Sequence, residues 1–100
     1  MALVYISEYS ALAMGGQQQA AKGPPLVVQS PLAIGGGSLQ SVAFSGATRY
    51  VRLNADSACN FAFGANPTAT ANVSERLPAN STEYFGVNAG DKVAIIAAAV

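Results

Sequence analysis

The stretch ATRYVRLNADSACNFAFGANPTATANVSERLPANSTEYFGV, residues 47–87, contains most of the features that decide the fold. Residues 50–53 alternate between large polar and aliphatic side chains, the period of two that is typical of a half-buried strand. Residues 54–57 are of types that favour turns, and residues 59–63 then alternate again. The two runs therefore predict a β-hairpin. The side chains that this pattern places inward are Val51, Leu53, Cys59, Phe61 and Phe63.

Short runs on either side of this hairpin predict further strands. They are separated by Gly, Pro and Asn, and none of them keeps a helical period. Many short strands with such separators predict an all-β fold, either an antiparallel β-sandwich or a small jelly roll or barrel. The further strands are expected within residues 2–9, 26–29, 38–45 (with Val42 and Phe44 inward), 72–77, 82–87 and 92–98.

The 100 residues are enough for a single domain. Three consecutive glycines at 35–37 divide it into an extended N-terminal strand, arm and loop (1–37) and a compact β core (38–100). Residues 10–23 have no regular period and are expected to form a loop or arm, because a helix over 17–22 would be too short for stability. We expect the N-terminal part to be less ordered than the core and to dock on a neighbour in an assembly.

Composition restricts the possible partners. Charged residues are 10% of the chain, hydrophobic residues are 51%, and five basic residues balance five acidic ones. Since phosphate binding needs a basic surface, no nucleic-acid partner is expected. No membrane is expected either, because the apolar tail at 93–100 is too short to span a bilayer and the N-terminus lacks the basic region of a signal peptide. A net charge near zero favours association, which indicates a homo-oligomer or lattice-bound copies.

Catalytic and metal-binding chemistry has little basis in the residues. No histidine is present to activate the one cysteine, and Cys59 on an apolar strand face is typical of a small buried hydrophobe. The acidic residues are scattered singly, so no metal and no cofactor is expected. The alternatives are a calcium ion between Asp56 and Asp91, and a catalytic carboxylate pair at Glu75 and Glu83. The sequence predicts that the protein is not an enzyme.

Several residues are candidates for an interface. Arg49 and Arg52 fall on opposite faces of one predicted strand, so one of them would project from the buried face. It would either pair with Glu83 or lie in a subunit contact, where arginine is enriched. Segments 3–6 and 93–96 are apolar on both faces and would need cover from flanking strands or from another subunit. The candidate interface residues are Leu3, Tyr5, Arg49, Arg52, Tyr84 and Ile96.

Five short motifs carry a resemblance to a known group of proteins. They are YISEY at 5–9, TRYVR at 48–52, AFG at 62–64, NPTAT at 66–70 and EYFGV at 83–87. The run 48–87, together with 5–9, resembles small proteins that tailed bacteriophages encode among their head and virion structural genes. The similar region covers about half of the chain.

This resemblance implies a phage virion protein, namely a capsid decoration or minor capsid subunit that binds the head lattice through apolar and strand-edge contacts. Its partners would be the major capsid protein or other virion proteins. Its location would be the phage head, and the host cytoplasm during assembly. The similar residues include no catalytic or ligand-binding group to transfer. The alternative function is a carbohydrate-binding or fibre-type surface module of a phage head or tail, with Tyr50 or Tyr84 as a stacking platform.

Overall fold

The computed structural model describes residues 2–10, 12–15, 18–21 and 25–98 and contains strands but no helix in these ranges. The strands are short and are joined by turns and irregular segments, as the distribution of Gly, Pro and Asn predicts. They are β1 (Leu3–Tyr9), β2 (Leu12–Gly15), β3 (Gln18–Ala21), β4 (Val27–Val28), β5 (Leu32–Ala33), β6 (Leu39–Gln40), β7 (Tyr50–Ala55), β8 (Cys59–Gly64), β9 (Glu75–Leu77), β10 (Ser81–Gly86) and β11 (Lys92–Ala97).

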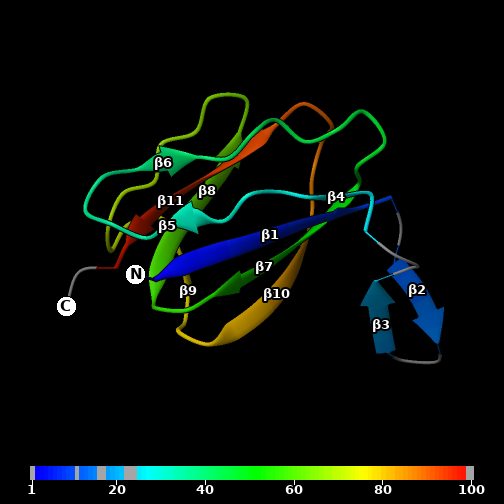
Figure 1. Ribbon diagram of the computed structural model, residues 1–100, viewed down its shortest axis with the longest axis horizontal. Helices are drawn as coiled ribbons and strands as arrows, with labels where there is room; N and C mark the ends of the chain where they lie inside the picture. Colours follow the sequence, from blue (N-terminus) through cyan, green and yellow to red (C-terminus); the bar gives the residue numbers. More distant parts are fainter. Residues whose placement is uncertain (1, 11, 16–17, 22–24, 99–100) are drawn as a thin grey trace.

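Two antiparallel sheets pack face to face (Figure 1). The five-stranded sheet has the order β10-β7-β1-β4, with β5 also paired to β1. The four-stranded sheet has the order β6-β11-β8-β9. Because the two sheets are separate and each has open edges, the fold is the β-sandwich among the predicted alternatives.

The predicted hairpin at 50–63 is wrong. β7 pairs with β1 and β10, whereas β8 pairs with β9 and β11, so the two strands lie in opposite sheets. The turn at 56–58 crosses from one sheet to the other and forms an arch. Both arrangements bury the same alternating side chains, and for this reason the period of two does not distinguish them.

The core lies between the sheets and contains most of the side chains predicted to face inward. Phe63 is only partly buried, although its ring packs against those of Phe61 and Phe85 at centroid distances of 5.6 and 5.4 Å. Val42 was expected inward but is 73% exposed, because β6 ends at Gln40 and the chain is irregular beyond it. The buried cluster consists of Val4, Ile6, Phe44, Val51, Leu53, Ala55, Cys59, Phe61, Leu77, Val93 and Ile95.

The N-terminal strand belongs to the core. β1 lies at the centre of the five-stranded sheet, between β7 on one side and β4 and β5 on the other. Val4 and Ile6 are fully buried, so the division at residue 37 does not separate an arm from the core over 2–9. β2 and β3 pair only with each other and stand to one side of the sandwich (Figure 1). They are strands in a part of the chain where the sequence predicts a loop or arm without regular structure.

The closing strand needs no cover from another subunit. β11 is central in its sheet, paired with β6 and β8, and Val93, Ala94 and Ile95 are fully buried. The chain itself therefore covers both faces of these residues. Of the two alternatives for residues 93–96, cover by flanking strands is therefore confirmed, and cover by another subunit is not needed.

A buried carboxylate joins β1 to two segments outside it. Glu8 accepts hydrogen bonds from Gln29 Nε2 at 2.7 Å, the Ser45 backbone N–H at 2.8 Å and Thr48 Oγ1 at 2.7 Å. All three donors are uncharged. Gln29 also exchanges hydrogen bonds with the backbone of Val42. These side-chain bonds add to the backbone bonds that join Ser41 to Val93 and Phe44 to Asp91 in the irregular segment 41–48.

Replacing Phe61 by alanine should lower the free energy of unfolding by about 3–5 kcal/mol, because the ring is buried and packs against the rings of Phe63 and Phe85. The partly buried Phe63 should lose less on the same change, and the exposed Val42 should change by less than about 0.5 kcal/mol. Urea melts of the three variants measure this order. Equal losses at Phe61 and Val42 would contradict the assigned core.

Glu8→Gln should destabilise the protein by about 1–3 kcal/mol, because the new amide nitrogen is a donor where three donors already converge. Gln29 is unable to adapt by turning its amide without breaking its bonds to Val42. Glu83→Gln is the matched control at an exposed position and should stay within about 0.5 kcal/mol of the parent. Denaturant melts at neutral pH compare the two, and similar midpoints would argue against the network.

Candidate functional site

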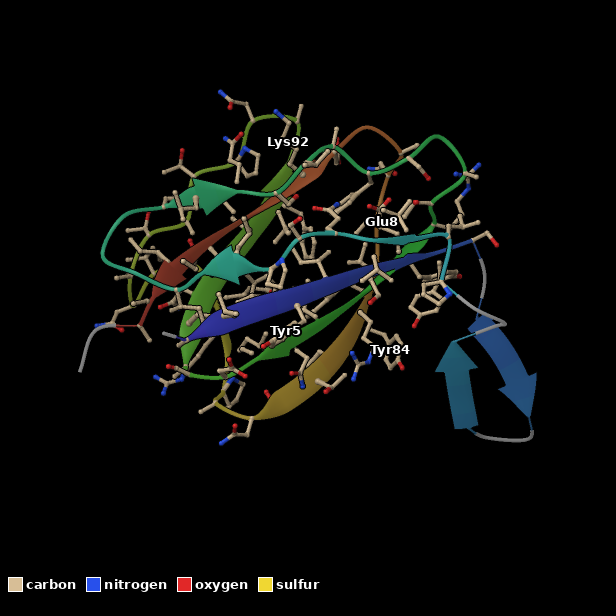
Figure 2. The ribbon with its side chains drawn as sticks, viewed as in Figure 1. Tyr5, Glu8, Tyr84 and Lys92 are labelled. Carbon is tan, nitrogen blue, oxygen red and sulfur yellow. The ribbon has the colours of Figure 1, made fainter. Side chains whose placement is uncertain are left out.

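All four tyrosines of the chain lie on the outer face of the five-stranded sheet. Along β1, the even-numbered Val4, Ile6 and Glu8 face the core, so Tyr5 and Tyr9 lie on the opposite, outer side, where Tyr5 is exposed and Tyr9 is buried. Figure 2 shows Glu8 and Tyr5 on opposite sides of β1, with Tyr84 on the same side as Tyr5. We call this surface the tyrosine face. Its residues are Leu3, Tyr5, Ser7, Tyr9, Tyr50, Arg52, Asn54, Thr82 and Tyr84.

The strand register arranges the tyrosine face as rows across β1, β7 and β10. Partners in a row lie on adjacent strands about 4.8 Å apart, and successive rows are about 7 Å apart along the strands. The central row therefore places the one charged residue of the face, Arg52, between Ser7 and Tyr84. From β1 to β10, the rows read Tyr9, Tyr50, Gly86; then Ser7, Arg52, Tyr84; then Tyr5, Asn54, Thr82.

The rings are packed at one end of the tyrosine face and open at the other. The ring centroids of Tyr9 and Tyr84 are 6.4 Å apart, with the ring planes inclined by 52°. Tyr50 lies above Gly86, where an added Cβ would meet its Cε1 atom at 3.9 Å. Tyr5 and Tyr84 are 40% and 42% exposed, so these two rings offer the accessible aromatic surface.

Hydrogen-bonding groups lie between the two accessible rings. Asn54 Nδ2 donates to Thr82 Oγ1 at 2.7 Å and to the Ser81 carbonyl at 3.3 Å. These bonds hold the amide in place, so its Oδ1 atom has a fixed position on the surface. Arg52 is half-buried beside Tyr84 and adds a planar cation that suits aromatic contacts.

An apolar border extends the tyrosine face across β4. Val28 pairs with Ser7, so its exposed side chain continues the central row beyond β1. Leu26 precedes β4 by one residue and is exposed as well. The seven large hydrophobic side chains that are exposed in the described part of the chain include Tyr5, Leu26, Val28 and Tyr84. Such a concentration on one side of a small protein is typical of a contact surface.

The structure brings together four of the six predicted interface residues, Leu3, Tyr5, Arg52 and Tyr84, on the tyrosine face. Arg49 instead precedes β7, where its exposed guanidinium donates to the carbonyls of Gly46 and Thr48 at 3.3 and 3.1 Å. Neither arginine enters the core, so the expectation that one must is wrong. Ile96 is half-buried on the other sheet.

Tyr9 was not predicted as part of this surface, and Tyr50 was considered only as a stacking platform. Both belong with Tyr5 because β1 and β7 pair with Tyr9 opposite Tyr50. The signal was present as the even spacing between Tyr5 and Tyr9, which places both residues on one face of a strand. It could not be used without knowing which strand lies next to β1.

The other candidate sites do not assemble. Within the described residues no three His, Cys, Asp or Glu side chains come together in a way that could hold a metal ion. Asp56 lies before the start of β8, and Asp91 lies beside the end of β8, because the next residue, Lys92, pairs with Gly64. The two carboxylates are therefore near opposite ends of this strand and do not form the candidate calcium site. Glu75 and Glu83 are exposed on strands of different sheets.

An open depression of about 370 Å³ lies beside β8 and offers little chemistry. Its polar lining consists of Ser74 and Glu75, and Ser74 Oγ already accepts a hydrogen bond from the Thr70 N–H. The depression is lined by Phe61, Ala62, Phe63, Val73, Ser74 and Glu75.

Among the described residues, no helix has the length and apolar character needed to cross a bilayer.

No protein-family model, curated protein or solved structure matches the chain. The tyrosine face is therefore the main basis for inferring a function.

Burial raises the pKa of the Cys59 thiol from its ordinary value of 9.0 to about 11. The folded state then holds a proton that the unfolded state releases, so stability is full below pH 9 and falls as pH rises towards 11. The loss should reach about 2–3 kcal/mol, at about 1.4 kcal/mol per pKa unit. Denaturant melts at several pH values in this window measure how the free energy of unfolding changes with pH. This free energy should fall less steeply with pH for Cys59→Ala than for the parent protein. Equal slopes for the two proteins would contradict the raised pKa of Cys59.

Proposed function

We propose that this protein is a structural binding protein of a phage particle, a capsid decoration or minor capsid subunit that attaches through the tyrosine face. The observation that carries the proposal is that all four tyrosines gather on one sheet face, where Tyr5 and Tyr84 are exposed, while charged residues are only 10% of the chain. Tyrosine and arginine are enriched at protein interfaces, whereas lysine, glutamate and aspartate are depleted there. The tyrosine face contains Arg52 and no lysine, glutamate or aspartate.

The physical basis of attachment would be apolar burial with a few fixed polar contacts. Tyrosine offers a large rigid ring and one hydroxyl, so it gains contact area with little loss of side-chain freedom. Val28 and Leu26 enlarge the apolar area beside the rings. A stable contact buries on the order of 800 Å² on each partner, so it would include this border as well as the tyrosine face.

The resemblance to phage virion proteins supports the choice of partner. The similar motifs include residues 5–9, 48–52 and 83–87, which form most of β1, the start of β7 and most of β10. These three strands bear the tyrosine face. The major capsid protein is therefore the partner that we propose, with the chain located on the phage head.

A second candidate function is carbohydrate binding by the same face, as in a fibre-type surface module. Tyr5 and Tyr84 lie two strands and one row apart, about 12 Å by standard sheet spacings. Their accessible rings flank Asn54 and Arg52, so apolar platforms and hydrogen-bonding groups alternate as a chain of sugar rings requires.

Tyr5→Ala and Tyr84→Ala should each weaken binding to capsids made without this protein by about 10–100-fold, the usual effect of removing a well-packed interface aromatic. Val42→Ala and Val73→Ala are matched controls, because both side chains are exposed and lie off the tyrosine face. Bound protein is measured by sedimentation with the particles, and thermal melts confirm that each variant is folded.

Attachment should also survive a wash in about 1 M salt, where charge interactions are screened beyond roughly 3 Å. Release at that step would contradict a contact that is mainly apolar. Failure of the parent protein to bind capsids, combined with tyrosine-dependent binding to a host surface polysaccharide, would replace the proposed function with the second candidate.

A further inference from the structure

The edges of the two sheets are unequal. In the five-stranded sheet, the edge opposite β10 consists of β4 and β5, two residues each, with Pro31 between them. In the four-stranded sheet, β6 has two residues, and β9 has three and is followed by Pro78. Short strands and prolines are the usual means by which proteins block edge pairing. β10, by contrast, is an uninterrupted edge of six residues.

The free backbone groups of β10 can be assigned from the ladder. Val87 N–H donates to Arg49 O at 2.9 Å, which makes 87 and 49 a hydrogen-bonded pair in the register of β10 with β7. The backbone N–H and C=O groups of successive residues in a strand point to alternate edges, so those of residues 81, 83 and 85 also bond to β7. The N–H and C=O groups of Thr82, Tyr84 and Gly86 therefore point to the open edge.

Little on β10 would block a partner strand. The strand contains no proline and no lysine, and Glu83 is its one charged residue. Four of its six positions, Thr82, Glu83, Tyr84 and Gly86, are exposed. None of the outward backbone groups takes part in the hydrogen bonds that the structure describes within the chain. An edge of this kind is a ready template for another strand.

We propose that a second copy of this chain pairs with β10 through its own β10, antiparallel and across a two-fold axis at Tyr84. A two-fold contact joins a surface to itself, so it needs a self-complementary edge. With the axis at Tyr84, Thr82 of each copy lies opposite Gly86 of the other, and each outward N–H meets a carbonyl. The pairing joins the two five-stranded sheets into one.

Side chains favour this register over its neighbours. An axis at residue 83 would place the two Glu83 carboxylates opposite each other, which is unfavourable. An axis at Thr82 would pair fewer residues of the two β10 strands. With Tyr84 at the axis, Glu83 lies opposite Phe85, and the two Tyr84 rings meet on the outer side. The formal net charge of +0 provides no long-range repulsion between copies. The tyrosine face then continues from one copy to the next.

This self-association does not depend on the proposed function. Dimer formation is measured in the purified protein, whereas attachment is measured as binding to particles. A dimer whose tyrosine variants still bind particles would overturn the proposed function alone. A monomer that binds particles through its tyrosines would overturn the dimer alone.

The first test is Thr82→Pro, which removes an N–H from the open edge and leaves the ladder to β7 intact. Thr82→Val is the matched control, because it also loses the hydroxyl that Asn54 contacts but keeps the N–H. Sedimentation equilibrium should find a dimer for the parent and Thr82→Val, and at least a tenfold weaker dimer for Thr82→Pro. A parent that stays monomeric, or a folded Thr82→Pro that dimerises like the control, would overturn the proposal.

The second test is needed if Thr82→Pro fails to fold. Directly opposed residues of a hydrogen-bonded antiparallel pair have Cα atoms about 5.5 Å apart, within the range for a disulfide. Tyr84→Cys should therefore give a cross-linked dimer under mild oxidation, and the native Cys59 is buried and should not compete. Val73→Cys is the exposed control away from β10. Cross-linking of Tyr84→Cys no faster than that of Val73→Cys would count against the two-fold axis.

Discussion

The arrangement of this sandwich depends on one buried carboxylate. A buried charge is unfavourable unless hydrogen bonds replace its hydration, and Glu8 obtains all of its protein hydrogen bonds from uncharged donors. These donors come from Gln29, directly after β4, and from residues 45–48, before β7. The carboxylate therefore joins both segments to β1, while backbone bonds to residues 90 and 91 hold Phe44. Loss of the carboxylate would remove the acceptor that its three donors share.

This polar centre and the tyrosine face are opposite sides of the same strand. β1 directs Glu8 into the molecule and Tyr5 out of it. The hydrogen-bonded interior makes β1 a rigid central strand, so the aromatic side chains outside it have a defined spacing. Binding through such a surface loses little conformational freedom, because the rings are already positioned before a partner arrives.

The sequence was sufficient for the fold class and for much of the core, but not for strand pairing. Alternation identified Val51, Leu53 and Phe61 as inward because one buried face is a local property of a strand. It did not show that β7 and β8 lie in different sheets, since an arch and a hairpin bury the same residues. Val42 was misplaced because side-chain hydrogen bonds between residues distant in sequence leave no local pattern. The grouping of the tyrosines likewise required the register between strands.

The arch between β7 and β8 also has a consequence for how the chain acquires its structure. Because these neighbours go to opposite sheets, β7 finds its partner in β1, and β8 finds its longest partner in β11 at residues 92–97. Neither sheet can be completed by local pairing, and contacts between distant segments slow folding. We therefore expect folding on the order of milliseconds to seconds. During synthesis, the four-stranded sheet can be completed only after β11 has left the ribosome, when the rest of the chain is already exposed to the cell.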